Sequence, residues 1–93
     1  MTFPLKRFTV SGSSMLPTLK PGQDVLVWCW FLKLKVGDLV VFKKNGKEMI
    51  KRIQIVHDHE YFVVGDNKKM STDSRNFGKV NKSDIIGKVI WYG

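Results

Sequence analysis

Hydrophobic residues lie along the chain in short runs separated by residues typical of turns. β-branched and aromatic side chains dominate the runs at 25–32 and 39–42, a composition that favours strands over helices. Further runs predict a lead-in strand at about 7–11, a strand at 61–64 and a last strand at 87–92. Short strands with a turn roughly every eight to twelve residues predict an all-β fold, a small barrel or sandwich of mostly antiparallel strands.

Asn45-Gly46 is the strongest local turn signal in the sequence. Both residues tolerate a positive φ, which the preferred two-residue hairpin loop requires. We therefore expect a hairpin between the strand at 39–42 and a return strand from Glu48 to Val56. His57-Asp58-His59-Glu60 predicts a second turn directly after that strand.

Two polar stretches complete the predicted organisation. The glycine-flanked residues from Gly65 to Gly78 are expected to form a loop, and Ser83-Asp84 to open one helical turn before the last strand. A chain of 93 residues has room for one small core and little room for a second. We therefore predict a single domain over residues 1–93.

Basic residues outnumber acidic ones, with 16 Lys and Arg against 8 Asp and Glu and a net charge of +8. This charge favours an anionic partner, either nucleic acid or an acidic membrane surface. The stacked aromatic residues on a basic strand pair that single-strand binding requires are not evident, so nucleic acid is not the expected partner. The longest apolar run, Val25 to Leu32, is far short of the roughly 20 residues that span a bilayer. No apolar stretch of a cleaved export signal follows Lys6 and Arg7.

Ser14 lies where the chain must leave regular strand pairing. Pro17 follows three residues later; it has no amide hydrogen for a strand ladder, and it restricts Leu16 to an extended conformation. The serine hydroxyl should therefore be held in the open by rigid backbone. A serine that only caps a turn would fit the same pattern.

Lys51 stands inside an otherwise apolar strand. Alternation places it on one face with Met49 and Ile53, and Arg52 on the other. A lysine in a strand commonly points to solvent. A lysine among apolar atoms instead has a lowered pKa, and its neutral amine can take the proton of a serine hydroxyl, as serine–lysine pairs do.

The histidines and the cysteine are weaker candidates for a functional site than Ser14 and Lys51. His57 and His59 lie in a turn with Asp58 and Glu60, and we interpret them as turn residues because a metal site would need a third and fourth ligand. Cys29 is the single cysteine, which excludes an intrachain disulfide and a cysteine zinc site. We predict no cofactor and no metal.

Four stretches, taken together, resemble the boxes of type I signal peptidases. These boxes are Ser-Met-x-Pro-Thr, a Gly-Asp-Val-Val strand, Lys-Arg, and Gly-Asp-Asn…Ser-x-Asp-Ser-Arg-x-x-Gly-x-Val. The matching stretches here are Gly12–Leu19, Gly37–Phe42, Ile50–Ile53 and Gly65–Val80. Order and spacing match from about residue 9 to residue 90. The resemblance implies a signal-peptidase-like β-barrel and a serine endopeptidase that cleaves an extended signal or leader peptide after small residues.

The resemblance implies catalytic roles for Ser14, Lys51 and Ser71. Ser14 would be the nucleophile, and Lys51 the general base that later acts as general acid. Ser71 would hydrogen-bond the Lys51 amine and hold it toward Ser14. The backbone N–H of Ser14 would be one oxyanion donor.

The same resemblance implies supporting residues. Asp73 would pair with Arg75, and Asp66 with Arg52, which would fix the loop against the strand behind the base. The pocket for the small residue before the scissile bond would be lined by Met15, Met49 and Ile50.

The sequence also departs from the family pattern. Gly12 stands where some members have a serine whose hydroxyl completes the oxyanion hole, and the side chain of Ser13 should point away from Ser14. The large insert that some members carry before the Gly-Asp-Asn box is missing, and no membrane anchor precedes the serine box in this sequence. This compact form resembles the short branch labelled nickel-type superoxide dismutase maturation proteases.

Two other functions stay open. A self-cleaving repressor-type domain shares the serine–lysine pair, but that group lacks the Asp-Ser-Arg box and carries a separate DNA-binding domain. A non-catalytic basic β-barrel could use the +8 charge to bind an anionic membrane or nucleic acid.

An aromatic run suggests how the protein could meet a membrane without a spanning segment. The run contains Trp28, Trp30, Phe31 and Leu32, and Lys33 and Lys35 follow it. Tryptophan favours the headgroup region, and lysines add attraction to an anionic surface. The hypothesis makes the protein membrane-associated, on a side that the sequence does not specify. In a soluble protein the same residues would cover the core or a partner subunit.

Overall fold

The computed structural model describes residues 3–30 and 33–93, which form short strands joined by turns. The strands are β1 (Leu5–Thr9), β2 (Asp24–Trp28), β3 (Leu39–Lys44), β4 (Lys47–His57), β5 (Glu60–Val64), β6 (Val80–Asn81) and β7 (Ile85–Tyr92). Three helical segments of three or four residues are η1 (Lys68–Met70), α1 (Ser74–Phe77) and η2 (Lys82–Asp84). The predicted all-β class and the helical turn near Ser83 are confirmed.

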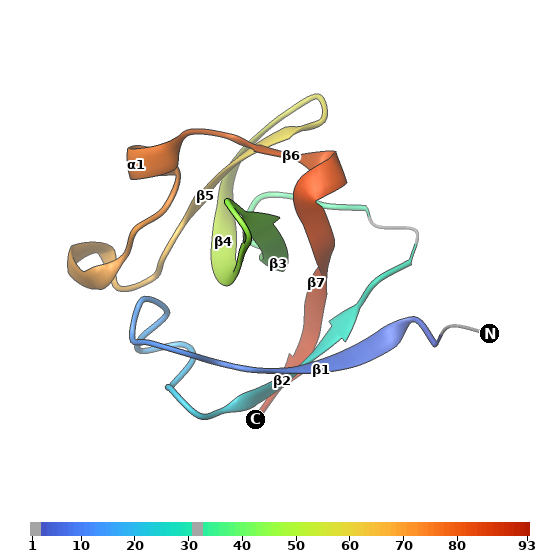
Figure 1. Ribbon diagram of the computed structural model, residues 1–93, viewed down its shortest axis with the longest axis vertical. Coiled ribbons are helices and arrows are strands. Elements are labelled where there is room, and N and C mark those ends of the chain that lie inside the picture. The colour runs from blue at the N-terminus through green and yellow to red at the C-terminus, as the bar shows by residue number, and fades with distance from the viewer. Residues whose placement is uncertain (1–2, 31–32) are drawn as a thin grey trace.

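The strands form one antiparallel sheet in the order β1-β2-β7-β3-β4-β5-β6. Figure 1 shows β3 and β4 in the centre, with β1 and β2 on one side and β5, β6 and α1 on the other. Strand β7 runs between the two sides and joins them through β2 and β3. Within the described residues β1 and β6 are the two edges, so the sheet is open rather than a closed barrel.

The core consists of two clusters that use opposite faces of β3. Leu39 and Val41 belong to one cluster, and Val40 and Phe42 to the other. Because successive side chains of a strand point to opposite faces, a strand covered on both sides is apolar at every position. This is why the run at 39–42 has no polar alternation.

Turn chemistry fixes the hairpin that carries the predicted lysine. Asn45 and Gly46 have φ of 52° and 76°, and they join β3 to β4 in direct register, with Lys44 opposite Lys47. Asp58, also at positive φ, lies in the predicted second turn. Both expected turns are therefore confirmed.

The stretch from Gly65 to Gly78 is more ordered than the loop that we expected. It contains η1 and α1. The side chain of Asp73 accepts a hydrogen bond from the backbone N–H of Arg75, while the side chain of Asn76 accepts one from the backbone N–H of Asp73. This reciprocal cap starts a helix of four residues, too short for a hydrophobic period to reveal.

Strand β2 is shorter than the predicted strand at 25–32. It ends at Trp28, while Phe31 and Leu32 lie outside the described residues. Val25 and Val27 are fully buried, whereas Trp28 keeps 39% of its surface exposed. One face of β2 therefore covers the core, and the other faces outward.

Candidate active site

Buried apolar residues hold the segment that carries Ser14. The chain leaves β1 at Thr9, and Val10, Met15 and Leu19 then anchor it in the core. The backbone N–H of Leu19 donates to the carbonyl of Met15. Ser14, half-buried, is therefore presented between two fixed points.

Lys51 on β4 meets Ser14 across 37 residues of sequence. Its Nζ donates to the Ser14 hydroxyl oxygen at 2.7 Å, although only 5% of the lysine is exposed. Pairing with β3 places Lys51 opposite fully buried Val40. The structure thus brings the two residues of the predicted pair into direct contact.

Burial lowers the pKa of Lys51 below its ordinary value. The negative charge of Asp73 opposes this effect, while the positive charge of Lys47 adds to it. A lowered pKa raises the fraction of neutral amine at a given pH, and only the neutral amine can accept a proton from a hydroxyl.

Asp73 is the polar centre of the loop behind the lysine. Its carboxylate is fully buried and accepts hydrogen bonds from the Gly65 N–H at 2.8 Å, the Ser71 hydroxyl at 2.8 Å and the Arg75 side chain at 2.9 Å. Burial alone would raise its pKa, but these bonds, led by that of Arg75, hold the pKa well below its usual range. The expected pair with Arg75 is thus part of a larger network.

Ser71 lies in this network by a different bond from the expected one. Its hydroxyl donates to Asp73 at 2.8 Å, and among the described residues it has no hydrogen bond to Lys51. An ideal Cβ built on Gly65 would lie 2.2 Å from Ser71 Oγ and 2.6 Å from the Ser14 carbonyl oxygen. Gly65 therefore allows the Ser71 loop to approach the backbone of Ser14.

The second expected pair links the loop to β4. Asp66 accepts from Arg52 Nε and Nη2, both at 2.8 Å, and these bonds lower the pKa of Asp66. Asp66 also accepts from the hydroxyl of Thr18, the last residue of the Ser-Met-x-Pro-Thr box. One carboxylate thus joins three segments: the loop, β4 and the serine segment.

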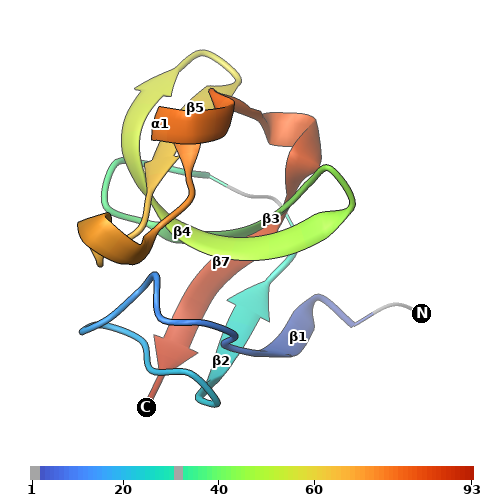
Figure 2. The ribbon, with the colours of Figure 1, turned by 60° about the vertical axis from the view of Figure 1, so that its left-hand side comes forward.

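Asn67 is a site residue to which the sequence analysis gave no role. Its backbone N–H donates to the carbonyl of Ser14 at 2.8 Å, and its side-chain Nδ2 to the carbonyl of Ser13 at 3.1 Å. Figure 2 shows the segment after β1 beside the loop that carries η1. Asn67 could have been singled out because it belongs to the Gly-Asp-Asn triplet. Its hydrogen-bond partner Ser13, 54 residues earlier, could not have been inferred from the sequence.

An open cleft of about 750 Å³ contains the Ser14–Lys51 contact. One wall is the segment 8–15. The other is formed by hairpin residues 41, 44, 45 and 47–51, with Met70, Thr72 and Phe77 completing the lining. The three residues predicted for the substrate pocket, Met15, Met49 and Ile50, all line this cleft. Strand β5 pairs with β4 only from Arg52 onward. In the described chain, residues 47–51 therefore have a strand partner only on the β3 side.

The two histidines lie away from this cleft. Both are exposed: His57 is the last residue of β4, with its Nδ1 4.0 Å from Asp58, and His59 lies in the turn before β5. Over residues 3–30 and 33–93, no three His, Cys, Asp or Glu side chains come together as a metal site would need. No helix in the same residues has the length and apolar character needed to cross a membrane.

The chain matches the model of the family described as signal peptidase, peptidase S26, over residues 1–55 and 54–92. The chain belongs to this signal peptidase family. The family resemblance read from the four boxes is confirmed.

Three relatives show how the match is distributed. Signal peptidase I U of Bacillus subtilis (strain 168) is 29% identical over 134 aligned positions, covering 88% of this chain and 72% of that protein. Signal peptidase IB of Staphylococcus aureus (strain Mu50 / ATCC 700699) is 34% identical over 70 residues, covering 72% of this chain and 37% of that protein. Signal peptidase I of Buchnera aphidicola subsp. Baizongia pistaciae (strain Bp) is 51% identical over 37 residues, covering 40% of this chain and 12% of that protein.

The chain thus spans well under half the length of two of these three relatives. The first alignment, at 134 positions, exceeds the 93 residues of this chain, so that relative contains residues that this chain lacks. The similarity to the nickel-type maturation branch stays a prediction.

Proposed function

We propose that the protein is a serine endopeptidase in which Ser14 is the nucleophile and Lys51 the general base. The observation that carries the proposal is the 2.7 Å contact between Lys51 Nζ and Ser14 Oγ, made by a lysine that is 5% exposed. Family membership favours this function over a self-cleaving repressor-type domain or a non-catalytic basic barrel.

In the proposed reaction the neutral amine of Lys51 takes the proton of Ser14 Oγ as that oxygen attacks the peptide carbonyl carbon. The ammonium then gives the proton to the leaving amine, and the C–N bond breaks to leave an ester on Ser14. Water then attacks the ester carbonyl carbon while Lys51 takes a proton from that water. The ammonium gives the proton to Ser14 Oγ as the bond between Oγ and the acyl carbon breaks, which releases the carboxylic acid and restores the serine. Burial supports this cycle because a lowered pKa of Lys51 raises the fraction of neutral amine that can accept a proton and makes the ammonium a stronger acid when it returns that proton.

The Ser14 N–H is the proposed oxyanion donor. Within the described residues it donates to no other group, while the Ser14 carbonyl is held by Asn67. Gly12, at φ of 76°, keeps its side of the segment open. Preorganised donors of this kind stabilise the charge that develops on the carbonyl oxygen.

Ser71 remains the proposed third catalytic residue, with Asp73 behind it. Because the Ser71 hydroxyl gives its proton to Asp73, its lone pairs are free to accept from a cation. We propose that it accepts from the Lys51 ammonium once that forms. Asp73, whose charge raises the pKa of Lys51, then limits how far burial lowers it.

The cleft supports an extended peptide as substrate. Residues 47–51 offer an unpaired strand edge on the cleft side, and a peptide can add to such an edge by main-chain hydrogen bonds. Met15, Met49 and Ile50 are the proposed pocket for a small side chain before the scissile bond. A signal or leader peptide is the substrate class that the relatives' names suggest.

The test is cleavage of a peptide with alanine at the intended bond, with labelling by a fluorophosphonate probe. We expect Ser14→Ala to abolish both cleavage and labelling, and Lys51→Ala to lower cleavage by several orders of magnitude. Ser83→Ala and Lys82→Ala, exposed substitutions on η2, are the matched controls. Wild-type activity in Lys51→Ala would overturn the assignment.

The pH profile tests the role of the lysine. A base must be neutral, so activity should rise with pH through the lowered pKa of Lys51. The His57→Ala, His59→Ala double variant should keep this rising limb. Its loss in that variant would assign the base to a histidine instead.

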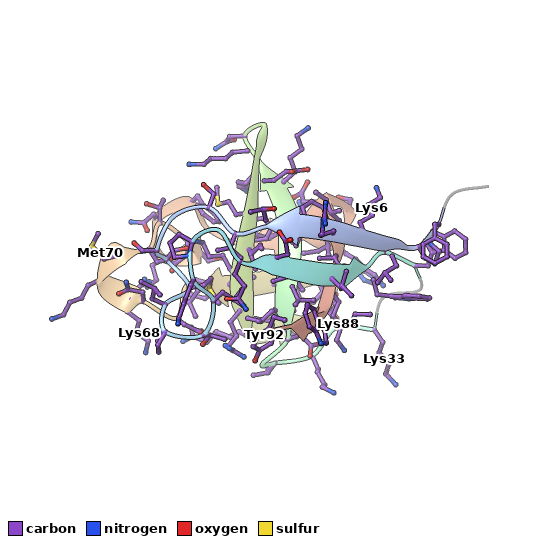
Figure 3. The ribbon with its side chains drawn as sticks, turned by 90° about the horizontal axis from the view of Figure 1, so that it is seen from below. Lys6, Lys33, Lys68, Met70, Lys88 and Tyr92 are labelled. Carbon is purple, nitrogen blue, oxygen red and sulfur yellow. The ribbon has the colours of Figure 1, made fainter. Side chains whose placement is uncertain are left out.

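A second proposal concerns the surface that meets the membrane. Leu26 and Trp28 on the outer face of β2 pair with Trp91 and Lys88 of β7; we name these four residues the β2–β7 patch. Trp91 is 55% exposed, and it extends the aromatic surface expected from Trp28 and Trp30. Lys6, Lys33 and Lys88 lie around β1 and β2 in Figure 3. We propose that this patch contacts an anionic membrane surface.

Sedimentation with vesicles tests the patch. Wild type should bind anionic vesicles more than neutral ones at low salt, and Trp28→Ser with Trp91→Ser should release it without unfolding it. Ile55→Ser, at an exposed apolar position on β4, is the control for the loss of apolar surface elsewhere. If wild type ignores anionic vesicles, the patch belongs to packing or to a protein partner.

A further inference from the structure

The end of the cleft at the β3–β4 turn is positively charged. Lys44 and Lys47 flank the turn and lie directly opposite each other, and both line the cleft. Like charges in directly opposed positions destabilise a strand pair. Neither amine forms an ion pair with a carboxylate of the described residues, so no carboxylate among them offsets the repulsion.

Lys44 and Lys47 differ in how they are held. Lys44 Nζ donates to the carbonyl of Lys79 at 3.4 Å and lies 5.8 Å from the centre of the Phe77 ring. Lys47 is exposed and has no such contact in the part of the chain that the structure describes. Its charge is therefore available to a molecule in the cleft.

Alternation along β4 places Lys47 on the same face as Met49 and Lys51. Four residues of extended strand correspond to about 13 Å, so Lys47 stands about four substrate residues from the scissile bond. Glu48 also lines the cleft, but it lies opposite Lys43 on the other face of the hairpin. The field of Lys47 reaches the reaction centre, since it contributes to the lowered pKa of Lys51.

We propose that Lys47, supported by Lys44, selects peptides that carry a carboxylate side chain about four residues from the scissile bond, on the side that runs along β4 toward the turn. This inference rests on the proposed function. A glutamate or aspartate there relieves the repulsion between the two lysines, and it pairs with the Lys47 amine, which has no ion-pair partner among the described residues. Complementary charge also speeds encounter, which raises kcat/KM.

The experiment uses peptides that share one cleavage site and differ by glutamate, glutamine or lysine at about three to five residues from it, on each side. For wild type we expect kcat/KM to favour glutamate over glutamine by about two- to fivefold at one position, with lysine least favoured. The preference should shrink as salt rises. In Lys47→Gln the glutamate-to-glutamine ratio should fall to about one, and in Lys47→Glu it should invert.

Two features of the design isolate the inference. Comparing peptides within one variant at one pH cancels any change that acts through the pKa of Lys51. Lys43→Gln, which removes the same charge from the opposite face, should keep the wild-type preference. The inference is overturned if no position shows a preference, or if Lys43→Gln removes it as fully as Lys47→Gln. If wild type cleaves none of the peptides, the proposed function itself is overturned.

Discussion

Two aspartate–arginine pairs hold the loop behind Lys51, and they differ in which segments they connect. The Asp73 side chain is fully buried, and its hydrogen bonds connect it only to residues of the loop itself, Gly65, Ser71 and Arg75. Asp66 keeps 16% of its side chain exposed and joins the loop to Arg52 on β4 and to Thr18 beyond the serine. The first pair therefore shapes the loop, while the second positions the loop against the segment that carries Ser14.

This difference separates stability from activity. A buried carboxylate without its partners carries the full cost of desolvation, whereas a partly exposed one can recover water. We therefore expect Asp73 to matter most for folding. We expect Asp66 to matter more for the geometry between Ser14 and Lys51.

The largest effect is expected from Asp73→Asn. The amide keeps the shape but turns an N–H₂ group toward neighbours that are themselves donors, the Gly65 N–H and the Arg75 guanidinium. Leaving a buried donor without its acceptor in this way typically costs about 1–3 kcal/mol of unfolding free energy for each group, and Asp73 accepts from several donors. Urea denaturation measures the loss. A loss as small as that of Asp66→Asn would erase the distinction between the pairs.

Acid should weaken wild type through the same carboxylates. The pKa of both aspartates is lowered in the fold, so their contribution is complete above the unfolded value of about 3.9 and is lost as pH falls below it. Each such group gives a slope of about 1.4 kcal/mol per pH unit. Denaturation at several pH values below 5 or so should show a shallower slope in Asp73→Asn than in wild type. An unchanged slope would place the acid-sensitive group elsewhere.

How much of this was visible in the sequence depends on how local the signal is. The strand at 39–42 and the turn at Asn45-Gly46 follow from patterns and turn chemistry within a few residues. The Ser14–Lys51 contact followed from the family resemblance, because nothing local relates residues 37 positions apart. The family order of the boxes supplied the long-range information.

What the sequence left out depends on contacts between distant segments. The position of β7 between β2 and β3 leaves no local pattern, and neither does the open edge of the sheet. Ser71 donates to Asp73 only two residues away, yet this choice depends on how Gly65 lets the loop approach Ser14. The helix α1 was missed because its cap uses Asn76 where Glu or Gln would be the recognisable signal.

Asp66→Asn should show the opposite balance from Asp73→Asn. The change weakens the bonds with Arg52 at a partly exposed site, where hydrogen bonds to a charged group contribute about 1.5–3 kcal/mol at most. The loop should loosen against β4 and the serine segment, so kcat should fall by more than the stability loss alone explains. Single-turnover cleavage at a temperature where all variants are folded makes this comparison. Normal kcat in a destabilised Asp66→Asn would assign this pair to folding alone.

The smallest effect, and the sharpest test of positioning, is expected from Thr18→Val. This substitution keeps the shape of the side chain but removes the hydroxyl that donates to Asp66, at a cost of about 1 kcal/mol in unfolding free energy. Suppose that Asp66 positions Ser14 through Thr18. Adding Thr18→Val to Asp66→Asn should then lower kcat little further, because Asp66→Asn has already weakened the bond that Thr18→Val removes. Thr72→Val, an exposed threonine that lines the cleft without a bond to Asp66, should instead combine additively with Asp66→Asn. Additive effects of Thr18→Val and Asp66→Asn on kcat would mean that the serine segment is positioned without this bridge, and that Asp66 acts through Arg52 alone.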